Sequence, residues 1–244
     1  MELAKEAIIM FFSKLRPNDS FGLVTFNNSA KTIIPVTRKS NIEMEAVTSL
    51  VRSIQVGGGT TLMTGFNQAY EDMNKYLTEN EFVKGSGAEN RLIMLTDVED
   101  NSIMNAHKFV QDVEESNIHT TIIGISDRFR SDVCESLNEV KGFNYFCATE
   151  IDDLKKYLFE NFSFTFFPDT FDIQISVSNK NTNSIEVYGT VDSSKVPIYN
   201  QDAVDHFIVT KSKTSFPSEL EIGEDGQVKT YGGLVLVKLN LIDK

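Results

Sequence analysis

Residues 91–97 have the sequence RLIMLTD, a short apolar run that ends in a threonine and an aspartate. A short apolar run flanked by polar residues is typical of a strand that is buried on both faces, as in a parallel sheet. In open sheets of this kind, ligands bind beyond the carboxyl ends of the strands. The sequence therefore predicts that Asp97 surfaces at the edge where such a sheet binds its ligands.

Strand and helix patterns alternate on both sides of this run. The predicted order is helix 3–15, strand 21–26, strand 30–36, helix 41–54, helix 62–77, strand 91–96, helix 102–116, strand 119–125, helix 130–140, strand 142–148 and helix 151–162. The first two strands are joined by a short polar turn and should form a hairpin. The alternation predicts an α/β fold, with a doubly wound, mostly parallel sheet, helices on both faces and an antiparallel edge strand.

The pattern changes after residue 162. Residues 159–171 are rich in phenylalanine, and we interpret them as a packed seam between two domains. Beyond the seam, alternating apolar residues predict strands at 171–177, 185–188, 207–210 and 234–242. We therefore divide the chain into an α/β domain, residues 1–162, and a small β-rich domain, residues 163–244.

Composition excludes several classes of protein. The 244 residues are 41% hydrophobic, which suits a globular protein, and the net charge of −12 argues against non-specific nucleic-acid binding. The chain has no apolar run of about 18 residues that could cross a membrane, and its N-terminal stretch MELAKEAIIM shows no signal peptide. Cys134 and Cys147 lack metal-ligand spacing, so we expect two unpaired thiols and a reducing compartment, with the cytoplasm preferred.

A glycine-rich turn leads into the helix predicted at 62–77. Its sequence, GGGTT at 57–61, supplies the hydroxyl of Thr60. Hydroxyl and carboxylate oxygens are the ligands of Mg²⁺, Mn²⁺ and Ca²⁺, so Thr60 and Asp97 are candidate metal ligands. The turn lacks the lysine of a nucleotide-binding P-loop, and the chain has no dinucleotide fingerprint.

At these residues the chain resembles the von Willebrand factor type A (vWA) domain. The matching stretches, in order, are ELAKEAIIMFFSKLRPNDSFGLVTFNNSAKTIIPVT (2–37), GGTTL (58–62), LIMLTD (92–97), TTIIGISD (120–127) and FNYFCATEIDDLKKYL (143–158). The resemblance covers residues 1–162. It implies a Rossmann-like fold and a non-enzymatic role in protein–protein interaction.

The resemblance also implies a metal-ion-dependent adhesion site, which the family builds from three loops. Thr60 matches the threonine of the second loop and Asp97 the aspartate of the third, while Val98 stands where a glycine often follows. The Asp-x-Ser-x-Ser motif of the first loop does not stand ahead of the first helix. Two protein ligands hold a divalent ion weakly, so we expect at most weak Mg²⁺ or Mn²⁺ binding.

The strand that carries the first loop lies in the middle of the family's sheet. Without it, the strands 21–26 and 91–96 would each have an open edge. We therefore interpret the chain as an N-terminally truncated vWA domain. An alternative is that the strand 234–242 fills the gap, instead of belonging to the β-rich domain.

The resemblance implies that a partner protein completes the metal coordination with an acidic side chain. The alternative is a metal-independent scaffold that binds through the β-rich domain. A hydrolase or nucleotide-binding enzyme is the least supported hypothesis, because the chain has no Gly-x-Ser-x-Gly elbow and no paired histidines. Its three histidines are isolated from one another: His107, His119 and His206.

Overall fold

The computed structural model describes residues 2–55, 57–59, 61–81, 87–97, 106–125, 140–177, 182–188, 198–199, 207–215, 219–222, 228–231 and 236–241, together with positions 134 and 137. Three residues considered above lie outside this set: Thr60, Val98 and His206. Most of the predicted helix 130–140 also lies outside it.

The N-terminal elements confirm the predicted order. They are α1 (Glu2–Lys14), β1 (Ser20–Phe26), β2 (Ala30–Arg38), the 3₁₀ turn η1 (Lys39–Asn41) and α2 (Met44–Ser53). β1 and β2 form an antiparallel hairpin. Its core joins Phe12 of α1 to Phe21 of β1, with ring centroids 5.1 Å apart, and both pack with the buried Val47 of α2. The amphipathic helices α1 and α2 therefore cover one face of the hairpin.

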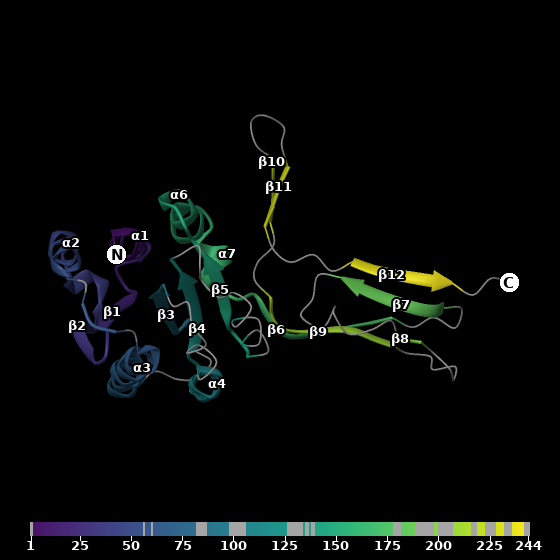
Figure 1. Cartoon of the computed structure of the whole chain (residues 1–244), viewed down its shortest axis with the longest axis horizontal. Coiled ribbons are helices and arrows are strands. Elements are labelled where there is room, and N and C mark those ends of the chain that lie inside the picture. The colour runs from purple at the N-terminus through teal and green to yellow at the C-terminus, as the bar shows by residue number, and fades with distance from the viewer. Residues whose placement is uncertain are drawn as a thin grey trace.

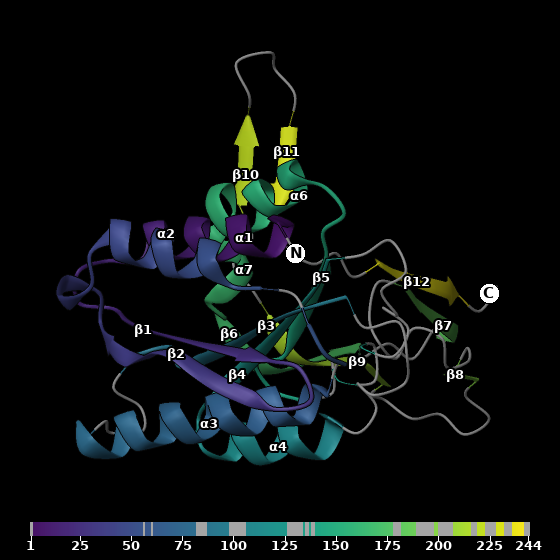
Figure 2. The same ribbon diagram turned by 60° about the vertical axis from the view of Figure 1, so that its left-hand side comes forward.

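A second sheet holds three parallel strands in the order β3–β4–β5. These strands are β3 (Arg91–Thr96), β4 (His119–Gly124) and β5 (Asn144–Cys147). Three helices that pack on this sheet are α3 (Leu62–Glu79), α4 (Ala106–Glu115) and α6 (Ile151–Lys155). Figures 1 and 2 show α3 and α4 on one face, and α1 and α6 on the other. The predicted doubly wound arrangement is confirmed.

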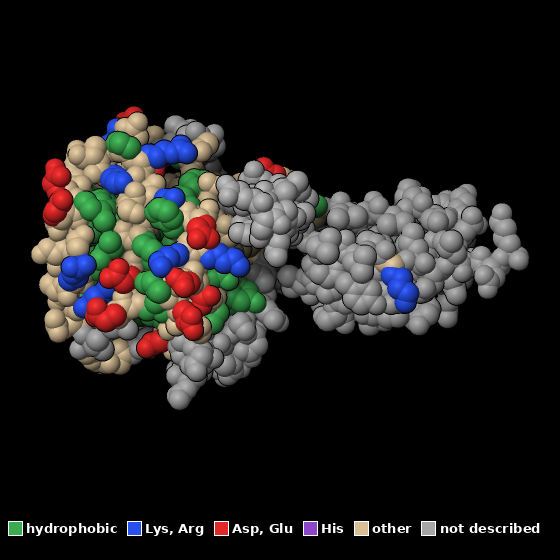
Figure 3. Space-filling model, turned by 90° about the horizontal axis from the view of Figure 1, so that it is seen from above, with side chains coloured by type: hydrophobic (Ala, Val, Ile, Leu, Met, Phe, Trp, Pro, Cys, Tyr) green, Lys and Arg blue, Asp and Glu red, His purple; other side chains and the backbone are tan. Residues whose placement is uncertain are grey.

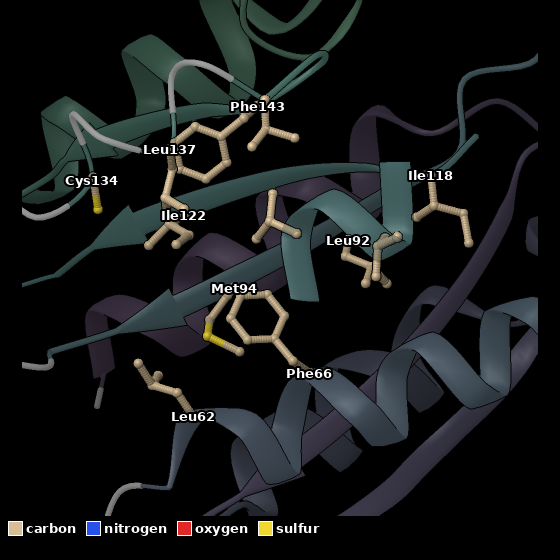
Figure 4. Close-up of a cluster of buried hydrophobic side chains, with 12 residues drawn as sticks. Leu62, Phe66, Leu92, Met94, Ile118, Ile122, Cys134, Leu137 and Phe143 are labelled. Atoms are coloured by element: carbon tan, nitrogen blue, oxygen red, sulfur yellow. The ribbon is translucent and has the colours of Figure 1, made fainter. Parts of the chain in front are cut away.

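Each face of the parallel sheet has its own apolar core. On the α3 face, Leu62 and Phe66 pack with Leu92 and Met94 of β3 (Figure 4). On the opposite face the buried members are Ala7, Ile123, Ala148, Leu154, Leu158 and Phe166. All six residues of β4 (HTTIIG) are buried, as expected for a strand that is covered on both faces, although its first three residues are polar.

The phenylalanine-rich segment packs differently from the predicted seam. Helix α6 continues as the π-helical turn η4 (Lys156–Glu160), and α7 (Phe162–Phe166) follows. The rings of Phe162 and Phe166 lie 5.5 Å and 5.4 Å from that of Phe11 on α1. These phenylalanines therefore complete the core of the α/β part.

Every described element after α7 is a strand. They are β6 (Thr170–Val177), β7 (Thr182–Tyr188), β8 (Ile198–Tyr199), β9 (Phe207–Ser215), β10 (Glu219–Ile222), β11 (Val228–Tyr231) and β12 (Leu236–Leu241). β6 pairs with β9, β10 with β11, and β7 with both β8 and β12, all antiparallel. The alternative in which residues 234–242 fill a gap in the α/β sheet is wrong, because β12 pairs with β7 (Figure 1).

The hairpin and the parallel sheet remain separate. Within the described ranges, no strand pairing joins β1 or β2 to β3. Helix α3 nevertheless lies tightly on β1, because a Cβ atom on Gly65 would come within 2.6 Å of the Phe26 ring. No disulfide joins Cys134 and Cys147, and none of the described helices is long and apolar enough to cross a membrane.

Candidate functional site

Asp97 lies directly beyond the carboxyl end of β3. The residue before it, Thr96, is the last residue of the strand and is buried, whereas Asp97 is exposed. The Asp97 carboxylate therefore lies at the surface, at the end of the strands where open α/β sheets bind ligands.

The glycine-rich loop is fixed to the turn that follows β1. The Asn27 side-chain amide donates to the carbonyl of Gly57 over 3.1 Å, and the N–H of Thr61 donates to the carbonyl of Asn27 over 3.0 Å. Gly58 has a φ of +83°, which favours glycine. A Cβ atom on Gly59 would lie 2.6 Å from the Asn28 side-chain oxygen, so a larger residue here would require the Asn28 side chain to move.

This loop leads straight into α3, whose first residue packs on β3. Figure 4 shows Leu62, the first residue of α3, beside Met94 in the carboxyl half of β3. The structure therefore brings the glycine loop toward the end of the sheet that carries Asp97. From this packing we predict that Thr60 lies near Asp97. Thr60 itself is outside the described residues.

The donor chemistry suits a hard cation, but the set of donors is small. Carboxylate and hydroxyl oxygens are the ligands that Mg²⁺ and Mn²⁺ prefer, and such ions take about six ligands. In the part of the chain that the structure describes, no group of three or more His, Cys, Asp or Glu side chains is placed to hold a metal ion. At this end of the sheet the described residues therefore offer the Asp97 carboxylate without a ready-made group of further carboxylate, histidine or cysteine ligands.

A second polar cluster lies at the amino ends of the same strands. The guanidinium of Arg91, the first residue of β3, contacts Glu89 Oε1 through Nη2 at 2.7 Å and Nε at 3.0 Å. The same oxygen lies 2.9 Å from Nδ1 of His119, the first residue of β4. Burial lowers the pKa of Arg91, and the Glu89 carboxylate opposes this shift.

The β6–β9 ribbon covers this cluster. The Phe171 ring of β6 packs on His119 with centroids 5.3 Å apart, and the N–H of Gly142 donates to Thr214 Oγ1 of β9 over 2.7 Å. With His119 only 6% exposed, the cluster is closed to ligands and joins β6 and β9 to the parallel sheet. This cluster is not among the predicted sites, and its one signal in the sequence is a charged residue, Arg91, at the start of an apolar strand.

The described surface offers little else that points to a ligand. Figure 3 shows acidic and basic side chains interspersed with apolar ones on the face that it displays, without a broad patch of either charge. A hollow of about 310 Å³ lies between the end of α1 and the η4–α7 segment, where Lys14 Nζ sits 3.5 Å from the centroid of the Phe159 ring. The hollow is lined by two basic and two acidic residues, Lys14, Arg16, Asp19 and Glu160. Their charges cancel, so the hollow has no net charge that would favour an anionic or a cationic ligand.

Comparison with known proteins identifies the family. A family model described as the von Willebrand factor type A domain matches residues 1–163. The chain belongs to this family. Domains of the vWA family are protein-interaction modules. The match includes both the glycine loop and Asp97, and it ends within α7.

One curated relative and two solved structures illustrate the likeness. Inter-alpha-trypsin inhibitor heavy chain H1 of Sus scrofa is 32% identical over 96 residues, which are 39% of this chain and 10% of that protein. A von Willebrand factor type A structure from Catenulispora acidiphila aligns with 100% of this chain and 55% of its own, at a TM-score of 0.57 and 16% identity.

The PilB minor pilin from Streptococcus sanguinis aligns with 66% of this chain and 52% of its own, at a TM-score of 0.51 and 14% identity. At such identities the two structures show the shared fold alone. The alignments span a tenth of the length of the porcine protein and about half of each structure.

Proposed function

We propose that the vWA domain binds a protein partner at the carboxyl end of β3, with Asp97 as the central contact. The observation that carries the proposal is the contrast between the buried strand and the exposed carboxylate that ends it. The glycine loop, pinned to Asn27, supplies the adjoining surface. A charged group that is exposed beside a rigid sheet is available to a partner without rearrangement of the fold.

We further propose that Asp97 and Thr60 share a Mg²⁺ or Mn²⁺ ion with the partner. The partner would contribute an acidic side chain, since a hard cation with open coordination positions attracts carboxylate oxygen. Two protein ligands bind such an ion weakly, so cation and partner should each strengthen the binding of the other.

The one described histidine side chain is closed to substrates. His119 is buried, its Nδ1 lies 2.9 Å from Glu89, and Phe171 covers its ring. A general base must come within hydrogen-bond reach of a substrate proton, which this packing prevents. His119 is therefore not free to act as a general base. The hypothesis that competes with a cation-dependent contact at Asp97 is a metal-independent contact.

The test is a chemical-shift titration with the glutamate peptide acetyl-GGEGG-amide, in Mg²⁺ and in EDTA. The dissociation constant is expected to be at least about tenfold lower in Mg²⁺, which corresponds to about 1.4 kcal/mol. Asp97→Asn should abolish the difference, because it removes the charge that holds the ion. Asp112→Asn, at an exposed position on α4, should preserve it.

A matched peptide with glutamine in place of glutamate should bind equally weakly in both buffers. Glutamate-peptide binding that is the same in EDTA and in Mg²⁺, and that survives Asp97→Asn, would show a metal-independent contact. That result would favour the scaffold hypothesis.

A further inference from the structure

Asn27 connects two segments of the proposed site that lie 30 residues apart in the chain. Its side-chain oxygen accepts from the N–H of Ser29 over 2.9 Å and from the Ser29 hydroxyl over 3.3 Å. Its side-chain nitrogen donates to the carbonyl of Gly57 over 3.1 Å. One end of the amide therefore closes the turn after β1, and the other end holds the glycine loop at 57–59.

The main chain of Asn27 strengthens both connections. Its N–H donates to the carbonyl of Ser29 over 2.8 Å, and its carbonyl accepts from the N–H of Thr61 over 3.0 Å. Asn27 is half-buried, and hydrogen bonds that water can replace add only modestly to the free energy of unfolding. The main effect of these bonds is therefore to fix the turn and the loop relative to each other.

The preceding residue, Phe26, supplies the packing at this place. A Cβ atom on Gly65 of α3 would lie 2.6 Å from the Phe26 ring, and Phe26 also packs against the cluster that contains Leu62. Phe26 thus positions α3 on β1, whereas Asn27 positions the loop that leads into α3. Loss of the Asn27 side chain should therefore release the loop without displacing the helix.

The glycine loop has no side chains of its own that could hold it in place. Gly57, Gly58 and Gly59 are exposed, and an added Cβ atom on Gly57 would meet nothing within 4 Å. At Gly58, where φ is +83°, an added Cβ atom would lie 3.0 Å from the side-chain nitrogen of Asn27. The loop therefore passes directly over the Asn27 amide. Because glycine has the most conformational freedom to lose, the loop needs this contact to keep a single conformation.

These contacts need a donor and an acceptor on one short side chain. Aspartate has the shape of asparagine, but its ionised carboxylate offers only acceptors and would face the Gly57 carbonyl. Serine can close the same kind of turn, but its side chain is too short to reach Gly57. We propose that Asn27 is a positioning residue, whose amide holds the glycine loop in the conformation that meets the partner beside Asp97. This inference rests on the proposed function, in which the loop adjoins Asp97.

The first arm of the test measures the order of the loop in the chain without ligand, in EDTA at neutral pH. The amide order parameters of the three loop glycines should be about 0.8 in the wild-type chain and fall below about 0.6 in Asn27→Asp. Asn28→Asp is the matched control, because it adds the same charge to the same turn and breaks none of the contacts described above. It should leave the loop ordered, and the midpoint of urea unfolding should change little in either variant.

A change of pH separates a lost donor from a deformed turn. When the carboxyl group introduced by Asn27→Asp is protonated, it has an O–H that can donate to the Gly57 carbonyl. The order of the loop should therefore return as the pH falls to about 4, where aspartic acid side chains titrate. The wild-type loop, measured in parallel, should be unchanged.

The second arm measures the binding of acetyl-GGEGG-amide in Mg²⁺. Asn27→Asp should raise the dissociation constant at least about fivefold, because the released loop must then lose its conformational freedom when the peptide binds. Asn27→Ser brings no charge and should have a similar effect. Asn28→Asp should raise the dissociation constant by less than about twofold, because salt screens an exposed charge.

Three results would overturn the proposal while the wild-type chain still binds the peptide. The first is a loop that keeps its order in Asn27→Asp. The second is a loop that loses its order and does not regain it on protonation. The third is a disordered loop with unchanged affinity for the peptide. A wild-type chain that does not bind the peptide would instead contradict the proposed function itself, and with it the role of Asn27.

Discussion

Replacing Glu89 with alanine is expected to lower the free energy of unfolding by about 3–5 kcal/mol. The Glu89 carboxylate lies 2.7 Å from the guanidinium of Arg91, whose side chain is only 5% exposed. Without Glu89 the buried charge loses its compensating partner, which is the costly way to break a buried ion pair. Urea denaturation, with the slope of the transition unchanged, measures the loss.

A surface pair supplies the control for this prediction. Glu79 lies 3.9 Å from Lys75, and its side chain is 61% exposed, so Glu79→Ala should cost at most about 1 kcal/mol. Adding Arg91→Met to Glu89→Ala should recover much of the stability, because the uncompensated charge is removed. Equal losses from Glu89→Ala and Glu79→Ala would contradict the role given to the buried pair.

Phe66→Ala is expected to destabilise the protein by about 3–5 kcal/mol, through lost burial and the cavity left behind. Phe66 is 1% exposed, its ring lies 5.1 Å from that of Phe109, and it packs in one cluster with Leu62 and Met94 (Figure 4). The substitution removes the side chain that holds α3 against β3. The midpoint of urea unfolding measures the effect.

Two variants calibrate the Phe66 result. Phe66→Leu keeps much of the apolar volume and should cost less than half as much as Phe66→Ala. Leu50→Ala, at a side chain of α2 that is 42% exposed, should cost less than about 1 kcal/mol. If Phe66→Ala were no worse than Leu50→Ala, the core on the α3 face would not stabilise the fold as described.

Much of the fold could be predicted from the sequence, because its periodic patterns are strong. The run RLIMLT at 91–96 forms β3, and the predicted helix 62–77 forms α3 with two further residues at its end. The break within the predicted helix 151–162 was missed. The apolar spacing of this segment continues through η4, whereas the packing of Phe162 on Phe11, 151 residues away in the chain, is a tertiary contact that local spacing does not reveal.

The polar cluster could not be predicted for a related reason. Arg91 and His119 open two different strands, and only the parallel register of β3 and β4 sets them opposite each other. Glu89 joins them from the segment just before β3. No sequence spacing encodes such a register, because it depends on how the intervening helix returns the chain to the sheet.

The candidate metal site was predictable only in part. The local sequence predicts where the apolar strand ends, and this places Asp97 directly beyond it. The position of the Thr60 hydroxyl depends on how the glycine loop turns toward the sheet, and this remains a prediction. Metal ligands that lie on separate loops are brought together only by the fold. The sequence can therefore suggest which residues are ligands, but not how they are arranged around the ion.

The most direct test of the proposed site is the map of amide line broadening produced by Mn²⁺. We predict that broadening centres on Asp97 and the glycine loop at 57–59, disappears in Asp97→Asn and persists in Asp112→Asn. Broadening that centres elsewhere, or that is unchanged in Asp97→Asn, would contradict a cation site at the carboxyl end of β3.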